Sequence, residues 1–76
     1  MSEEIKVGDR VIWESQSQGS WKRKEGIVLE IHKKWLKVNV DTIVGYDYDS
    51  RTEVGEKKHL RKGKIYTPIR RFCRKA

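Results

Sequence analysis

The stretch GIVLEIHKKWLKVNVD, residues 26–41, decides the fold because it holds two runs of alternating apolar residues around a pair of lysines. Apolar residues at every second position are typical of a strand with one buried face. The short interval at Lys33 and Lys34 predicts a tight hairpin between a strand over 26–32 and a strand over 35–41. The side chains predicted to face the core are Ile27, Leu29, Ile31, Leu36, Val38 and Val40.

Shorter apolar patterns on either side of this hairpin predict further strands. Over residues 10–14, Val11 and Trp13 share one face of the expected strand, and Arg10, Ile12 and Glu14 share the other. Another strand is expected over 43–48 or over 57–61. The turn signals between these segments are closely spaced, and no window carries a helical stripe. This combination is typical of a small all-β barrel or sandwich.

The C-terminal segment, residues 65–72, contains the only proline of the chain, Pro68. Proline has no backbone N–H, so it interrupts a strand or lies at a sheet edge. Ile69 and Phe72 stand three positions apart, which predicts one short turn with both side chains pointing inward. The two arginines between them are then expected to face solvent.

The chain has 76 residues, of which 36% are hydrophobic and 38% are charged. This length predicts one domain over residues 1–76 with a small core, a monomer with flexible ends at 1–6 and 74–76. Cys73 is the only cysteine, so a disulfide within the chain is excluded, which suits a reducing cytoplasm. An acidic N-terminus and the lack of a long apolar run predict a cytoplasmic protein with no membrane partner.

The positive charge is distributed very unevenly along the chain. Residues 1–55 hold nine Lys/Arg and ten Asp/Glu, whereas residues 56–76 hold nine Lys/Arg and one Asp/Glu. A basic segment of this density destabilises the compact state by self-repulsion, which a polyanion relieves. The basic C-terminal segment therefore predicts a nucleic acid, DNA or RNA, as the partner.

No pattern supports catalysis or metal binding. Asp41, Asp47 and Asp49 form an acidic patch, but D-x-D spacing alone is a weak metal signal and favours an acidic turn facing the basic tail. One cysteine and two distant histidines cannot close a zinc site. No nucleophile motif and no phosphate-binding glycine loop is present. We predict no enzyme activity, no cofactor and no metal.

Residues 8–31, GDRVIWESQSQGSWKRKEGIVLEI, resemble small uncharacterised prokaryotic and phage proteins with a W-x-S-Q-x-x-G-S-W-x-x-K-x-G-x-V signature. Residues 62–72, KGKIYTPIRRF, are similar to the basic, aromatic and proline-containing end of those proteins, with Thr67 in place of a second aromatic. This resemblance covers about half of the chain and brings no settled function. The residues that fit the signature are Trp13, Ser15, Gln16, Gly19, Ser20, Trp21, Lys24, Gly26 and Val28.

A broader likeness is to SH3-like barrels of the Tudor and KOW type. The V-G-D-x-V opening at residues 7–11 and the G-x-V-x-x-I strand at 26–31 are similar to that pattern. The resemblance implies a five-stranded SH3-like barrel with binding loops at one end. Because such barrels bind peptides, methylated side chains, RNA, DNA or other proteins, it implies no particular partner.

Three clusters of cations form the predicted nucleic-acid site. The first lies in the segment 15–24, expected to be a loop between the first two strands. The second is the Lys33–Lys34 hairpin, and the third follows Pro68. Lysine and arginine bind phosphates, and exposed tryptophan stacks on bases. The predicted phosphate-binding residues are Lys22, Arg23, Lys24, Lys33, Lys34, Arg70, Arg71 and Arg74, and the predicted stacking residues are Trp21 and Trp35.

Each of these features also has a structural or non-nucleic-acid interpretation. Trp21 as a buried plug would pin its loop to the sheet, and Trp35 as a lid would lie under the basic tail. The basic face also suits docking on an acidic protein surface, or solubility alone. A Tudor-like aromatic cage requires Trp13, Tyr46 and Tyr48 to converge on one pocket. These alternatives stay open at the level of sequence.

Overall fold

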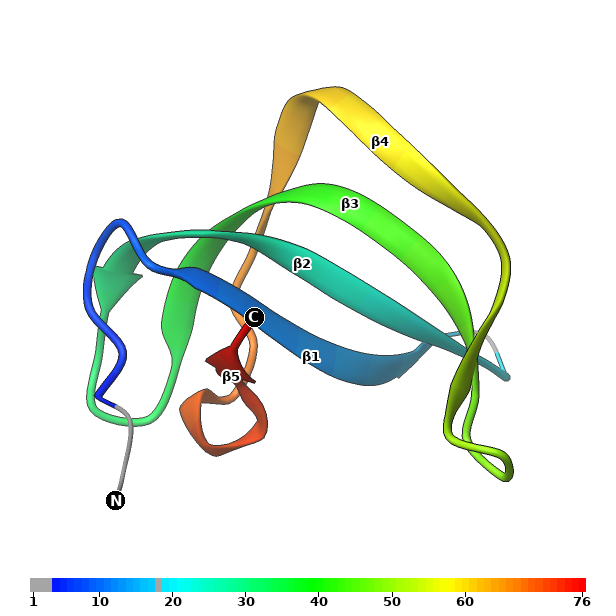
Figure 1. The fold of residues 1–76 in the computed structure, drawn as a ribbon. Coiled ribbons are helices and arrows are strands. Elements are labelled where there is room, and N and C mark those ends of the chain that lie inside the picture. Colours follow the sequence, from blue (N-terminus) through cyan, green and yellow to red (C-terminus); the bar gives the residue numbers. More distant parts are fainter. Residues whose placement is uncertain (1–3, 18) are drawn as a thin grey trace.

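A computed structural model describes residues 4–17 and 19–76, which form one five-stranded antiparallel sheet (Figure 1). The strand order across the sheet is β4-β3-β2-β1-β5. These residues contain no α-helix, and the prediction of an all-β chain is confirmed. No helix in this part of the chain has the length and apolarity to cross a membrane. The elements are β1 (Arg10–Ser17), β2 (Ser20–Ile31), β3 (Leu36–Asp47), β4 (Thr52–Tyr66), the 3₁₀ turn η1 (Arg70–Phe72) and β5 (Arg74–Lys75).

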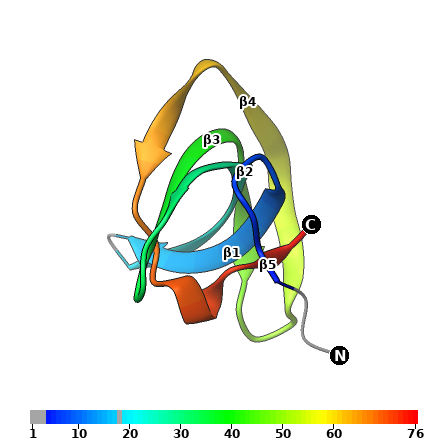
Figure 2. The same ribbon diagram turned by 90° about the vertical axis from the view of Figure 1, so that its left-hand side faces the viewer.

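The sheet is strongly curved, and β4 bends away from its neighbours (Figure 2). Residues 60–63 of β4 stand where β3 has only Asp41, so the two strands change register there. Gly63 lies in this bend with a φ of +69°, in the left-handed region that favours glycine. The edges of the sheet are β4 and β5, which do not pair with each other. The described chain is therefore an open curved sheet, not the closed barrel that was predicted.

The core lies on one face of this sheet and was largely predictable. Val11 and Trp13 of β1, which share one face of the predicted strand, are buried. On β3, the inward positions Leu36, Val38 and Val40 are fully buried. These residues form one cluster with Val28 of β2. Strict alternation along β3 therefore identified the buried face of that strand correctly.

The prediction for β2 was correct for Ile31 and wrong for Leu29, and Ile27 is only half-buried. Val28 is 1% exposed, whereas Leu29 is 40% exposed. Leu29 forms a β-bulge, an extra residue inserted between the rungs that pair Val28 and then Glu30 with β3. The bulge changes which side the following residues face, so Ile31 does pack against the core. An inserted residue cannot be recognised from alternation here, because Ile27, Val28 and Leu29 are all apolar and the sequence does not show which of them points inward.

The segment 15–24 is not a loop, as was expected, but most of a long hairpin. β1 continues to Ser17 and β2 begins at Ser20, with Gly19 in the turn at a φ of +80°. Consecutive side chains from residue 21 onward therefore point to opposite faces of β2. Both ranges that were offered for a fourth strand lie in strands. Residues 43–47 extend β3, and residues 57–61 belong to β4.

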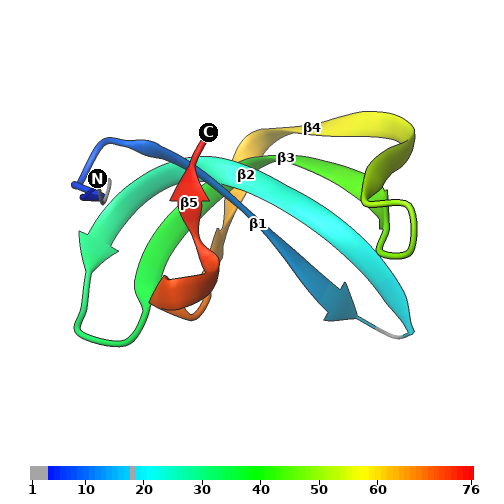
Figure 3. The ribbon, with the colours of Figure 1, turned by 60° about the horizontal axis from the view of Figure 1, so that its bottom comes forward.

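The C-terminal segment makes the predicted short turn, η1, but its apolar side chains do not point inward. Ile69 is 49% exposed and Phe72 is 52% exposed. A backbone hydrogen bond joins the segment to the start of β3, because the Leu36 N–H donates to the Pro68 carbonyl at 3.1 Å. After the turn, the residues that were expected to be flexible pair with β1 as β5. Figures 1 and 3 show η1 beside the connection between β2 and β3.

Candidate nucleic-acid interface

A cleft forms where the hairpin between β2 and β3 meets the η1 turn. Its volume is about 630 Å³ and its lining is Lys33, Lys34, Ile69, Arg70 and Arg71. The Arg70 N–H donates to the Lys34 carbonyl at 2.9 Å, so backbone contact fixes the two segments together. We call this site the basic cleft. It joins two cation clusters that stand far apart in the sequence and were predicted separately.

Within residues 4–17 and 19–76, no acid neutralises the cations of the basic cleft. The four lining cations form no ion pair with any acid of the described chain. The lining also contains no carboxylate. Like charges held together in a concave surface attract an anion, because the surrounding protein focuses their field. The charge of the basic cleft therefore suits an anionic ligand.

Trp35 lies at the hairpin beside the basic cleft and is 38% exposed. One face of its indole stacks on the His32 ring, with centroids 3.7 Å apart and an angle of 14° between the planes. Its backbone forms a single bridge to Ile69. Trp35 is thus neither a buried lid nor an unpartnered platform, since His32 already occupies one of its faces.

Arg23 and Arg74, two of the predicted phosphate-binding residues, are instead joined to Glu14. Arg23 Nε donates to Glu14 Oε2 at 2.8 Å, and Arg74 donates to both carboxylate oxygens. Arg23 also pairs with Glu53 at 2.9 Å. Burial alone raises the pKa of Glu14, but the hydrogen bonds from Arg74 and then Arg23 outweigh it and lower the pKa. These two guanidinium groups hold β1, β2, β4 and β5 together.

Lys24, another predicted phosphate-binding residue, is buried at 7% exposure. Its Nζ donates to Ser15 Oγ at 2.5 Å and lies 5.1 Å from the centre of the Tyr66 ring. Burial, followed by the like charges of Lys22 and Lys64, lowers the pKa of Lys24. The residue belongs to the interior of the curved sheet, while its neighbour Lys22 is exposed.

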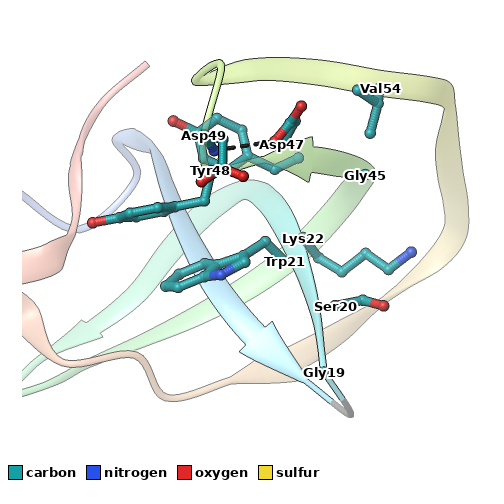
Figure 4. Close-up of a pocket in the computed structure, with 10 residues that line it drawn as sticks. Gly19, Ser20, Trp21, Lys22, Gly45, Asp47, Tyr48, Asp49 and Val54 are labelled. Carbon is teal, nitrogen blue, oxygen red and sulfur yellow. Dashed lines mark hydrogen bonds between the residues drawn. The ribbon is translucent and has the colours of Figure 1, made fainter.

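Trp21 stacks on Tyr48 at the far end of the β1–β2 hairpin, with ring centroids 4.7 Å apart (Figure 4). Tyr48 is 53% exposed and Trp21 is half-buried. Figure 4 shows Asp47 and Asp49 above this pair, with the Lys22 side chain pointing away from it. We call Trp21 and Tyr48 the aromatic pair.

The three aromatics named for a cage, Trp13, Tyr46 and Tyr48, do not converge on one pocket. Tyr48 contacts Trp21, whereas Trp13 makes an edge contact with Tyr66 at 6.4 Å between centroids. Tyr46 is covered by the Arg23 guanidinium, 4.7 Å from its ring centre. The three aromatics proposed for the cage therefore serve three separate contacts.

A second group of cations lies along β4, most of which is exposed. Only Lys57 among them has a described ion pair, with Glu53 at 3.8 Å. The bend of β4 lies at the opposite end of the molecule from η1 (Figures 1 and 2). The positive charge of the C-terminal part is thus divided between two surfaces. The β4 cations are Lys57, Lys58, Arg61, Lys62 and Lys64.

No protein-family model, no curated protein and no solved structure matches this chain. Within residues 4–17 and 19–76, no three His, Cys, Asp or Glu side chains are grouped so that they could hold a metal ion. Sequence reasoning found all four cations of the basic cleft but missed Ile69, Phe72 and Tyr48 as surface residues. Nothing in the sequence marked them, because exposed and buried apolar side chains look alike in a pattern.

Proposed function

We propose that this chain is a nucleic-acid-binding module whose phosphate contacts are made by the basic cleft. The observation that carries the proposal is the meeting of Lys33 and Lys34 with Arg70 and Arg71, none of them neutralised by a described acid. Lysine and arginine that bind phosphates release condensed counterions, which supplies most of the affinity of non-specific binding. The cleft offers this electrostatic attraction on one surface.

The proposed binding has low sequence selectivity. Reading bases in the major groove requires an α-helix or a β-ribbon that enters it. The described residues contain no α-helix, and the cleft is built from a hairpin turn and a 3₁₀ turn. Contacts from such turns to phosphates position a nucleic acid without reading its sequence.

We further propose that this open curved sheet is related to the SH3-like fold of the Tudor or KOW type. Support comes from the order β4-β3-β2-β1-β5, in which a four-stranded meander is followed by a short strand that returns to the first. The strong bend in β4 and the 3₁₀ turn before β5 are further support. Because SH3-like domains also bind proteins, docking on an acidic protein surface is the rival function.

The test is a salt titration of binding to single-stranded and duplex oligonucleotides and to poly-glutamate. For the wild type, log affinity for nucleic acid should fall linearly with log salt concentration. The double variant Lys33→Gln/Lys34→Gln should bind more weakly, with a slope smaller by about 1.4–1.8, because each lost phosphate contact removes about 0.7–0.9.

The matched control is Arg61→Gln/Lys62→Gln, which removes the same charge from the bend of β4. We expect this variant to keep most of the wild-type affinity and slope. Equal losses in both double variants would show attraction by net charge alone and would contradict the basic cleft as the site. Binding to poly-glutamate as tight as binding to nucleic acid would favour the acidic-protein alternative instead.

A further inference from the structure

A second cleft lies next to the basic cleft and is walled by aromatic rings. Its volume is about 430 Å³, and the aromatic pair, Trp21 and Tyr48, lines it together with Phe72. Arg71 lines both this cleft and the basic cleft, so the two are adjacent. We call the second one the aromatic cleft. On the assumption that the proposed function holds, we propose that the aromatic cleft receives unstacked bases and that the natural ligand is single-stranded nucleic acid.

The rings of this cleft are unusually exposed for a chain with so small a core. Tyr48 is 53% exposed and Phe72 is 52% exposed. Large aromatic faces left in water mark a binding surface, especially when polar residues surround them. A base that stacks on such a face recovers about 1–3 kcal/mol, and every base has a face to offer.

Charge decides which ligand suits these rings. Arg71 places its guanidinium 5.1 Å from the centre of the Phe72 ring, next to the mouth of the basic cleft. The only acid in the lining, Glu14, is held by Arg23 and Arg74 and repels a phosphate little. An anionic strand therefore finds a cation that is unpaired in the described chain, Arg71, beside the Phe72 wall of the cleft.

The opposite side of the aromatic pair is acidic, which decides the path that the bound strand follows across the surface. Asp47 and Asp49 line the pocket on that side, where the Asp49 N–H donates to Asp47 Oδ1 at 3.0 Å (Figure 4). Neither carboxylate has an ion pair in the described chain. Phosphates are repelled from this side and attracted toward Arg71, so the strand runs from the aromatic pair into the basic cleft.

These features favour a single strand over a duplex. In a duplex the base faces are stacked on one another and are not available to side chains, whereas unpaired bases can be splayed onto aromatic rings. The basic cleft alone attracts either form. The aromatic cleft adds a contact that only the single strand can make.

The experiment compares Phe72→Ala with Val7→Ala in the full chain, using a fluorescent single strand and the duplex of the same sequence at one salt concentration. Phe72 is exposed, so its variant should remain folded, and a thermal melt checks this. Phe72→Ala should weaken single-strand binding by about 5- to 150-fold, the range that corresponds to one lost base stack. Its duplex affinity and its salt slope should stay at wild-type values, because stacking releases no counterions.

The control residue Val7 is 62% exposed and lines none of the described clefts. Its truncation should leave both affinities unchanged. Equal binding of single strand and duplex by the wild type, or an unaltered single-strand affinity in folded Phe72→Ala, would overturn the aromatic cleft while leaving the basic cleft standing. Absence of salt-dependent binding to either form would instead overturn the proposed function itself.

Discussion

Glu14 connects the strands of this small sheet through its carboxylate. It accepts hydrogen bonds from Arg23 on β2 and from Arg74 on β5, so a single side chain fastens the short last strand to the hairpin. A chain of this size has few buried contacts to hold its edges. Partly buried ion pairs that share one carboxylate are worth more than isolated surface pairs, because a network fixes the geometry.

The pH dependence of stability should report this network. Burial raises the pKa of Glu14, but the hydrogen bonds from Arg74 and Arg23 outweigh burial and hold this pKa below the usual glutamate value in the folded chain. A lowered pKa means that the stabilisation is fully present above the unfolded pKa and is lost as the pH falls through the folded pKa. Denaturant unfolding of the wild type should therefore show stability that falls as the pH drops below the usual glutamate pKa of about 4.3.

Glu14→Gln removes the titrating group and keeps the shape of the side chain. This variant should be less stable at pH 7, and its stability should decline less steeply toward acid. An acid decline as steep as that of the wild type would place the titrating carboxylates elsewhere, for example at Asp41, whose pKa is lowered by Arg10.

Residue roles that depend on a partner strand were not predictable from the sequence. Lys22, Arg23 and Lys24 form one basic run, yet the first is exposed, the second is paired with acids and the third is buried. The strand that contains them separates their side chains onto two faces. The run suggested a single loop surface because the extent of the β1–β2 hairpin was not recognised.

At the level of elements, β1 and β3 were predictable in their buried faces and β2 was not. The difference lies in the bulge at Leu29, which inserts a residue into an apolar run. The η1 turn was predicted from Pro68 and from the spacing of the following apolar residues, but the side on which those residues lie depends on backbone contacts with the β2–β3 connection. The local pattern thus predicted the turn but did not predict the side on which its apolar residues lie.

Two leucines test the position of the bulge. Leu36 is fully buried, so Leu36→Ala should lower the free energy of unfolding by about 2–5 kcal/mol, enough to unfold much of so small a domain. Leu29 is 40% exposed, and Leu29→Ala should cost less than about 1 kcal/mol. Thermal and urea unfolding measure both changes. Similar large losses in the two variants would mean that Leu29 faces the core and that β2 has a regular register.

For the whole molecule, the open curved sheet separates two cationic surfaces. The hairpin and the η1 turn gather four cations at one end, and the bend of β4 carries others at the opposite end. The sequence predicted the excess of positive charge and the residues of the basic cleft. It did not predict that β4 would hold half of the C-terminal cations away from that cleft, because the bend depends on register shifts between β3 and β4.

The most direct measurement of the central claim is a titration of isotopically labelled protein with a short single-stranded oligonucleotide, followed by amide NMR shifts. The largest changes should fall at residues 33–34 and 69–72, with smaller ones at Trp21 and Tyr48. Residues 57–64 of β4 should change little, although they carry comparable charge. Shifts concentrated on β4, or spread evenly over every exposed lysine, would contradict a nucleic-acid site at the basic cleft.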